Sequence, residues 1–174
     1  MDKETIADLI DTKHTMLIDW LNEQPSVSWT EGPEGKWTTG QHALHLLQSI
    51  KPLNNALSLP KFVLRYKFGT ANRPVRDYDA IVKRYEERLE QAKGKTYKGS
   101  QNMKVPSLKE RRYILNRLQT ESKKLQYKTK KMSNKHLDHL ILPHPLMGKM
   151  PVREIIMWTA HHVAHHTETL KSKY

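Results

Sequence analysis

The sequence of 174 residues contains no cysteine. This absence excludes disulfide bonds, zinc sites with thiolate ligands and a cysteine nucleophile, so a metal site would have to use histidine and carboxylate ligands. No apolar run approaches the roughly 20 residues that span a bilayer, which argues against a membrane-spanning helix. The first ten residues carry acids and helical periodicity rather than a basic and then an apolar segment. We therefore expect a soluble, cytoplasmic protein without an export signal.

Phenylalanine is scarce, with two residues, whereas an excess of lysine and arginine gives a formal net charge of +12. A charge of this size makes nucleic acid or another anionic ligand a candidate partner. Because no base-stacking pattern of aromatic residues accompanies the charge, we favour a solvated helix face over a nucleic-acid groove. Much of the excess lies between Lys109 and Lys135, where apolar spacings of seven and three predict one long helix with a single buried stripe. The stripe consists of Leu108, Leu115, Leu118, Leu125 and Met132.

Helical periodicity accounts for most of the chain, and we find no strand pattern. A capping box, in which Ser or Thr is followed three residues later by Gln or Glu, begins a helix at Thr38–Gln41 and opens the basic helix at Ser107–Glu110. Proline is tolerated in the first turn of a helix, so the last helix is expected to begin at Pro151. The expected helices span residues 3–23, 39–57, 79–93, the basic stretch from 108, and 151–171.

The segment before the last helix contains helix breakers. Pro143, Pro145 and Gly148 forbid a continuous helix there and leave room for a short one over residues 136–141. A chain of this length, with these helices and loops of moderate length, suits one ordinary domain. We therefore predict an all-α fold, an up-and-down helical bundle with accessory short helices, in a single domain over residues 1–174.

Ten histidines are the main chemical resource of this chain, and four of them fall within six positions near the C-terminus. The sequence WTAHHVAHHTETL contains two interleaved pairs, His161 with His165 and His162 with His166. Residues four apart share a helical face, so either pair could place two imidazoles around one ion. Helical phase puts His162 and His166 on the side of Trp158 that continues the apolar arc, which makes them the better inward pair. A surface histidine cluster with incidental metal affinity stays open as the alternative.

A third ligand must come from another helix, because two imidazoles alone make a weak site. The helix over residues 39–57 offers His42 and His45. Its apolar face centres nearer His42, so periodicity alone favours His42. A hydrogen-bonded helix histidine is the alternative interpretation of either residue. The apolar face consists of Ala43, Leu46, Leu47, Ile50 and Leu57.

Three segments of the chain resemble a known family. The segment GKWTTGQHALHLLQS, from Gly35 to Ser49, closely resembles the W-[ST]-x-x-[QE]-x-x-x-H-[LIV]-x-x-S segment of the DinB-like superfamily. Its nearest likeness is the YfiT-type branch of metal-dependent hydrolases and bacillithiol S-transferase-like proteins. The run from His162 to Thr167 is similar to the H-x-x-H-H-T of that branch, and His144 to Gly148 resembles the H-P-x-x-G entry found in relatives.

The resemblance implies metal ligands at His45, His162 and His166, and it overrules the phase preference for His42. His165 corresponds to a family position that is not a metal ligand. The family fold is a four-helix bundle, often paired as a homodimer, with the metal near one end. From about Pro60 to Lys131 the chain offers no motif that matches the family.

Three neutral imidazoles around Zn²⁺ or Ni²⁺ leave coordination positions for water or a thiol, and the pKa of either falls on binding. The resemblance accordingly implies hydrolysis of a small-molecule substrate, or transfer of a low-molecular-weight thiol cosubstrate to an electrophile. A metal-bound bundle that binds a partner or an anionic ligand such as nucleic acid, without catalysis, is the alternative.

The sequence provides no convincing general base, and the catalytic residues stay unknown. Glu154 and Glu168 fall off the face of the inward histidine pair, so we expect both at the surface. His14 continues an apolar stripe and should point inward, although a lone inward histidine is usually a hydrogen-bonded core residue. The candidate pocket residues around the metal are His14, His42, His144, Trp158 and His165.

Overall fold

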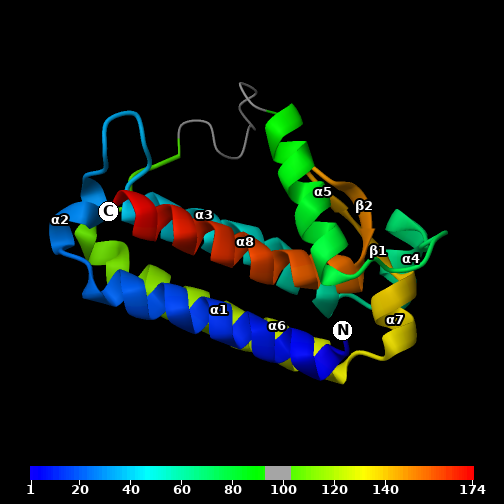
Figure 1. Cartoon of the computed structure of the whole chain (residues 1–174). Helices are drawn as coiled ribbons and strands as arrows, with labels where there is room; N and C mark the ends of the chain where they lie inside the picture. Colours follow the sequence, from blue (N-terminus) through cyan, green and yellow to red (C-terminus); the bar gives the residue numbers. More distant parts are fainter. Residues whose placement is uncertain (93–102) are drawn as a thin grey trace.

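Four long helices form the body of the protein (Figure 1). The computed structural model describes residues 1–92 and 103–174. The predicted all-α bundle is confirmed, and three of its long helices end within two residues of the expected position. Among the described helices, none combines the length and apolarity that crossing a membrane requires. The long helices are α1 (Lys3–Glu23), α3 (Thr39–Ser58), α6 (Arg111–Lys131) and α8 (Val152–Lys173).

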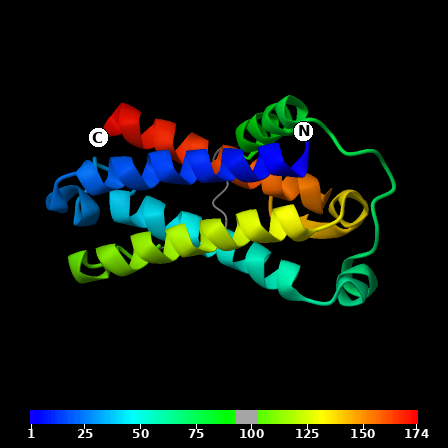
Figure 2. The same ribbon diagram turned by 90° about the horizontal axis from the view of Figure 1, so that it is seen from below.

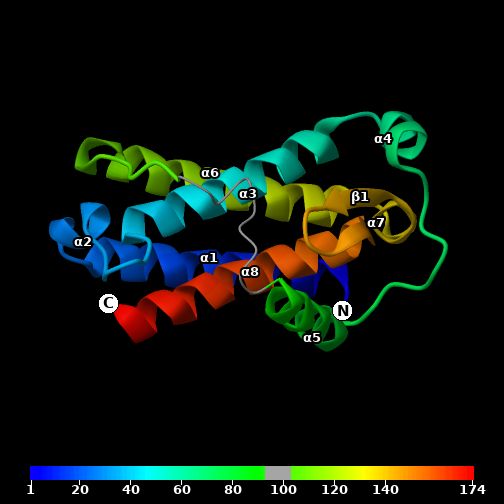
Figure 3. The ribbon, with the colours of Figure 1, turned by 90° about the horizontal axis from the view of Figure 1, so that it is seen from above.

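The long helices form a ring in which α6 packs between α1 and α3, and α8 closes the other side against the same two helices (Figures 2 and 3). Helices α1 and α8 run toward the end that carries the C-terminus, whereas α3 and α6 run away from it (Figure 1). Neighbours α3 and α6 are therefore parallel, so the order of the long helices departs from the expected up-and-down topology. The long connection between α3 and α6 returns the chain to the starting end. Helix α8 consequently lies antiparallel to α3, and the two helices meet through the side chains of His42 and His45 on α3 and of His162 and His166 on α8.

Shorter elements cover the bundle and its ends. Helix α5 packs against α8, and its expected final residue, Lys93, lies outside the described residues. Two short helices, α2 and α4, fall in segments for which the sequence predicted none. The short elements are α2 (Ser26–Thr30), α4 (Lys61–Phe68), α5 (Tyr78–Gln91), the 3₁₀ turn η1 (Leu108–Glu110), α7 (Asn134–His139), β1 (Ile141–His144) and β2 (Gly148–Pro151).

Both predicted capping boxes are confirmed. The Thr38 hydroxyl accepts the Gln41 backbone N–H at 3.1 Å, and the Gln41 side chain accepts the Thr38 N–H at 2.9 Å. In the second box the Ser107 N–H donates to the Glu110 carboxylate at 2.8 Å. Each box satisfies free N–H groups of a first turn, which fixes where α3 and η1 begin.

The expectation that the chain forms no strand is wrong. Strands β1 and β2 pair as an antiparallel hairpin, with His144 opposite Gly148. Prolines exclude a helix here, as predicted, but a two-stranded hairpin consists only of edge strands, which tolerate Pro143. Gly148 has φ +75°, a conformation that other residues rarely adopt. The hairpin matters for function because it places His144 next to α8.

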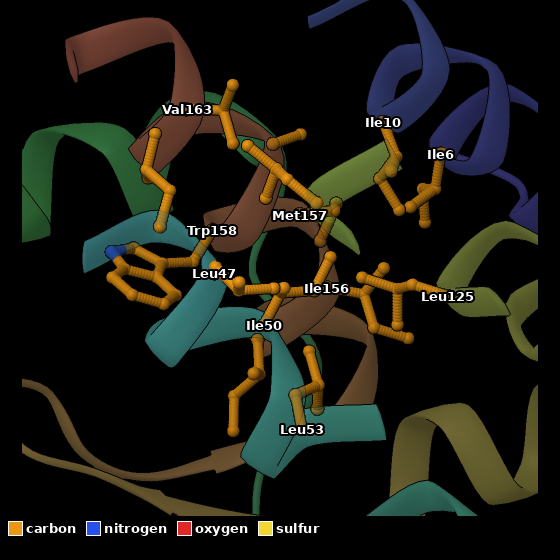
Figure 4. Packing of buried hydrophobic residues seen from close by; sticks show 14 of the residues in the cluster. Ile6, Ile10, Leu47, Ile50, Leu53, Leu125, Ile156, Met157, Trp158 and Val163 are labelled. Atoms are coloured by element: carbon orange, nitrogen blue, oxygen red, sulfur yellow. The ribbon is translucent and has the colours of Figure 1, made fainter. Parts of the chain in front are cut away.

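One continuous apolar cluster fills the space between the long helices, and Figure 4 shows part of it. The predicted stripe of α6 is buried from Leu115 to Met132. Leu108 is an exception, since 47% of it is exposed. It belongs to the turn η1, whose tighter winding breaks the helical phase on which the prediction relied.

The prediction that Glu154 lies at the surface is also wrong, because its side chain is fully buried. It accepts two parallel hydrogen bonds from the Arg73 guanidinium at 2.5 and 2.8 Å, and a third from the Arg76 backbone N–H at 2.7 Å. Burial raises the pKa of Glu154, but these hydrogen bonds outweigh it, so the pKa is lowered overall. The carboxylate thus ties the segment before α5 to the first turn of α8.

We expect Glu154→Ala to destabilise the protein by about 3 kcal/mol, because it leaves the paired Arg73 guanidinium without its partner. Arg76→Ala should cost less than about 1 kcal/mol, since its side chain lies at 3.4 Å from the carboxylate and is partly exposed. Urea unfolding followed by circular dichroism measures both. Equal, small losses in the two variants would contradict the anchoring role.

His14 is buried, as predicted, and its Nδ1 lies 2.8 Å from the Ile10 carbonyl oxygen. Burial lowers the pKa of His14 to about 4. Between about pH 6.5 and about pH 4 the unfolded chain therefore binds a proton at His14 that the folded chain does not bind. The contribution of neutral His14 to the free energy of unfolding is complete above about pH 6.5 and is lost as the pH falls toward about 4.

Replacing His14 with Leu removes that titration. Relative to wild type, His14→Leu should gain about 2 kcal/mol of unfolding free energy between about pH 7.5 and about pH 5. Denaturant unfolding with a chelator present compares the two proteins, and the other buried histidines cancel because both chains carry them. A difference that does not change with pH would mean that folding does not lower the pKa of His14.

Candidate metal centre

Three histidine side chains meet between α3 and α8. His162 and His166 lie one turn apart on α8, and their Nε2 atoms are 3.1 Å apart. The Nε2 atom of His45, from α3, lies 3.2 Å from Nε2 of His162. Each of the three offers a ring nitrogen, and these atoms all lie within 4.8 Å of one another. The inward pair chosen by helical phase and the third residue implied by the resemblance thus come together.

The spacing of these nitrogens suits a metal ion. Zn–N bonds of about 2.0–2.1 Å place two nitrogens of a tetrahedral site about 3.3 Å apart, close to the observed separations. Within residues 1–92 and 103–174 this is the one group of metal-binding side chains of that compactness, and it contains no carboxylate. The donor set of three imidazoles therefore fits a divalent cation and leaves coordination positions free for another ligand.

His42 is more buried than His45, as the phase argument predicted, yet it is not one of the three. Helix α3 packs against both α6 and α8, and its apolar face points between them. His45 lies at the edge of that face, beside α8, where it reaches His162. Helical phase gives the average direction in which the side chains of α3 are buried. Membership of the site depends instead on which residue of α3 faces α8.

Two side chains of α3 support the histidines of α8 from behind. Nδ1 of His42 lies 2.8 Å from Nδ1 of His166, and the Ser49 hydroxyl lies 3.4 Å from Nδ1 of His162. A partner at Nδ1 fixes the ring orientation and leaves Nε2 available for a metal. Sequence reasoning missed Ser49, although the family-like segment ends on it, four residues after His45.

Two tryptophans enclose the site. The Trp37 ring stacks on His166, with an interplanar angle of 7° and centroids 6.3 Å apart, and it also contacts His45. The Trp158 ring stacks on His162, with centroids 4.6 Å apart at 19°. Trp158 also belongs to the apolar cluster, so it both packs the core and walls the site.

The enclosure keeps the histidines neutral. Burial lowers the pKa of His45 to about 4 and holds the pKa values of His162 and His166 well below 6.5, where repulsion from neighbouring histidines adds to the effect. A neutral imidazole has the free lone pair that a metal ion needs.

The remaining candidate pocket residues differ in position. His144 packs against Trp158, with ring centroids 4.1 Å apart. His165 contacts His166 on one side and Tyr85 of α5 on the other, at centroid distances of 5.7 and 6.2 Å. His14 has no ring contact or hydrogen bond with the three histidines in the described part of the chain.

The two carboxylates considered as general bases stand apart from the centre. Glu168 is exposed, as expected. Glu154 is committed to Arg73 and Arg76 at the other end of α8. The geometry therefore assigns metal-ligating capacity to the site and no protein carboxylate as its base.

Comparisons with known proteins agree with this geometry. Searches of curated proteins and of solved structures found no match. A family model described as the DinB superfamily matches residues 9–170, which include all three histidines, the whole of α3, and α8 as far as Leu170. Because the match covers nearly the whole chain, this protein belongs to the DinB superfamily.

Proposed function

We propose that this protein is a metal-dependent enzyme that holds one divalent cation, Zn²⁺ or Ni²⁺, on Nε2 of His45, His162 and His166. The observation that carries the proposal is the convergence of these three atoms from two helices. The reaction proposed is hydrolysis of a small molecule, or transfer of a low-molecular-weight thiol to an electrophile.

One set of histidine tautomers prepares the cluster for a metal ion. When Nδ1 of His166 donates to His42 and Nδ1 of His162 donates to Ser49, both Nε2 atoms present lone pairs. Two lone pairs 3.1 Å apart repel each other in a buried site unless a cation lies between them. In this tautomer state a bound metal ion resolves the conflict, which supports the proposal.

When bound, a divalent cation lowers the pKa of a coordinated water or thiol and so supplies hydroxide or thiolate near neutral pH. The chain contributes the rest. Its histidines stay neutral through burial, His42 and Ser49 orient the rings, and the indoles of Trp37 and Trp158 exclude bulk water. Because the chain has no cysteine, the sulfur in a thiol transfer comes from a cosubstrate.

Elemental analysis of the purified, untagged protein should find about one Zn or Ni ion per chain. His45→Ala, His162→Ala and His166→Ala should each lose that ion, because two imidazoles do not retain it. The same samples are then tested for hydrolysis and thiol transfer. A wild type that is metal-free and cannot be reconstituted would overturn the proposal.

His42 gives a sharper comparison. His42→Ala should still bind one ion at saturation, but with about 10- to 100-fold weaker affinity, because His166 loses the partner of its Nδ1. His42→Asn is the matched control, since an amide oxygen can replace the accepting nitrogen. Competition with a chromogenic zinc chelator measures both affinities. Loss of stoichiometry in His42→Ala, with full binding by His45→Ala, would show that His42 is the ligand.

The alternative, a non-catalytic bundle that binds nucleic acid, rests on the net charge of +12. Several α6 lysines are already occupied within the protein. Lys124 pairs with Glu121, Lys130 with Asp8, and Lys128 donates to the Asn54 carbonyl and the Ser58 hydroxyl.

We therefore expect weak binding of labelled single- and double-stranded oligonucleotides at about 50 mM salt and none at about 200 mM. Fluorescence anisotropy measures both. Tight, sequence-selective binding that survives the higher salt would favour the binding-module alternative. The homodimer implied by the resemblance stays a prediction.

A further inference from the structure

Two buried N–H donors beside the metal centre have no acceptor in the described part of the chain. They are Nε2 of His144 and Nε1 of Trp158. Both residues are more than nine-tenths buried, with 9% and 8% of their surface exposed. A buried donor without a partner is costly, and in native proteins it usually marks an unseen water or ligand.

The contacts of His144 fix which nitrogen carries its proton. Its Nδ1 lies 3.1 Å from the Leu146 backbone N and 2.9 Å from the Met147 backbone N. Both backbone groups are donors, so Nδ1 must accept and carries no proton. The neutral ring then has its proton on Nε2, which is a donor and not an acceptor. The indole Nε1–H of Trp158 is a donor in every state.

The two donors lie on rings in contact with each other and with the centre. The His144 and Trp158 rings meet edge to face, with centroids 4.1 Å apart, and Trp158 stacks on His162. Figure 4 shows the indole nitrogen on the side of the ring turned away from Leu47 and Ile156. The N–H group therefore lies on the edge of the ring that faces away from these two residues, and the ring itself remains part of the cluster.

We propose that His144 and Trp158 bind a carbonyl-type oxygen of the substrate, that of an amide, ester or carboxylate group, beside the metal centre. A single sp² oxygen has two lone pairs, which match two donors. Two N–H donors without an acceptor beside them cannot coordinate a cation and cannot accept a hydrogen bond from an amino group. This inference rests on the proposed function, and it makes the substrate a carbonyl-bearing compound oriented with its oxygen toward these rings.

The test uses the full-length, ¹⁵N-labelled protein, both loaded with zinc and zinc-free, with the zinc content measured. The chain has four tryptophans, so the indole N–H region is simple, and Trp158→Phe identifies the Trp158 resonance. Acetamide and sodium acetate are the probes, because they have the same shape and differ in charge. Trp29 is an internal control, since its indole N–H already donates to the Ser107 carbonyl at 3.1 Å.

The Trp158 indole resonance should move downfield and saturate with at least one probe, whereas that of Trp29 should not. Trp158→Phe keeps an aromatic ring and removes the donor. His144→Asn keeps an acceptor for the backbone of residues 146 and 147 and removes the Nε2–H. Each variant should weaken probe binding about 2- to 10-fold. A response to acetamide assigns a neutral carbonyl, and a response to acetate alone assigns a carboxylate.

Three results would overturn the inference. One is a Trp158 resonance that neither probe moves and that shows cross-relaxation with water, which would mean that a buried water occupies the donors. Another is probe binding equally strong in both variants, which would place the probe on the metal alone. A third is a His144 Nε2–H shifted upfield and insensitive to both probes, since that proton would then lie against the indole face. Failure to load zinc rejects the proposed function separately, because the zinc-free sample still reports on the donors.

Discussion

The antiparallel contact between α3 and α8 is the constraint on which the candidate site depends. It sets His45 opposite His162 and His42 opposite His166, so that each α8 histidine meets a partner from α3. Structural features outside the site fix this register between α3 and α8. The capping box at Thr38 fixes where α3 begins, the apolar cluster fixes its depth, and the hairpin and the Glu154 anchor fix where α8 begins.

Burial of the three histidines between α3 and α8 determines their protonation state. In water an isolated histidine side chain has a pKa near 6.5, so it is half protonated at that pH. A ring that is protonated on both nitrogens cannot bind a metal. Here burial holds the pKa of all three histidines far below that value. The rings of Trp37 and Trp158 stack on His166 and His162 and contribute to this burial. The tryptophans thus link packing to chemistry, since the indoles that enclose the centre also keep its ligands neutral.

The chain separates its large charge from its site. The lysines of α6 lie on the far side of the bundle from α8, because α6 packs against α1 and α3. The ion pair between Glu154 and Arg73 lies at the first turn of α8, away from His162 and His166. Within the described residues no lysine or arginine is hydrogen-bonded to the three histidines, so the local chemistry is that of neutral rings.

The sequence by itself determined the long helices, because periodicity and capping boxes are local signals that act within one segment. It also selected His162 and His166, since helical phase places this pair, rather than His161 and His165, on the continuation of the apolar arc of the last helix. It did not predict the hairpin, because the two prolines in that segment gave no strand pattern. It also did not predict the burial of Glu154, because the hydrogen-bond partners of this carboxylate lie about 80 positions away in the chain. The choice between His42 and His45 needed the family resemblance, because phase averages over all neighbours of α3. Only the tertiary structure decided that His45 faces α8, since that depends on the register between two helices more than 90 residues apart in the chain.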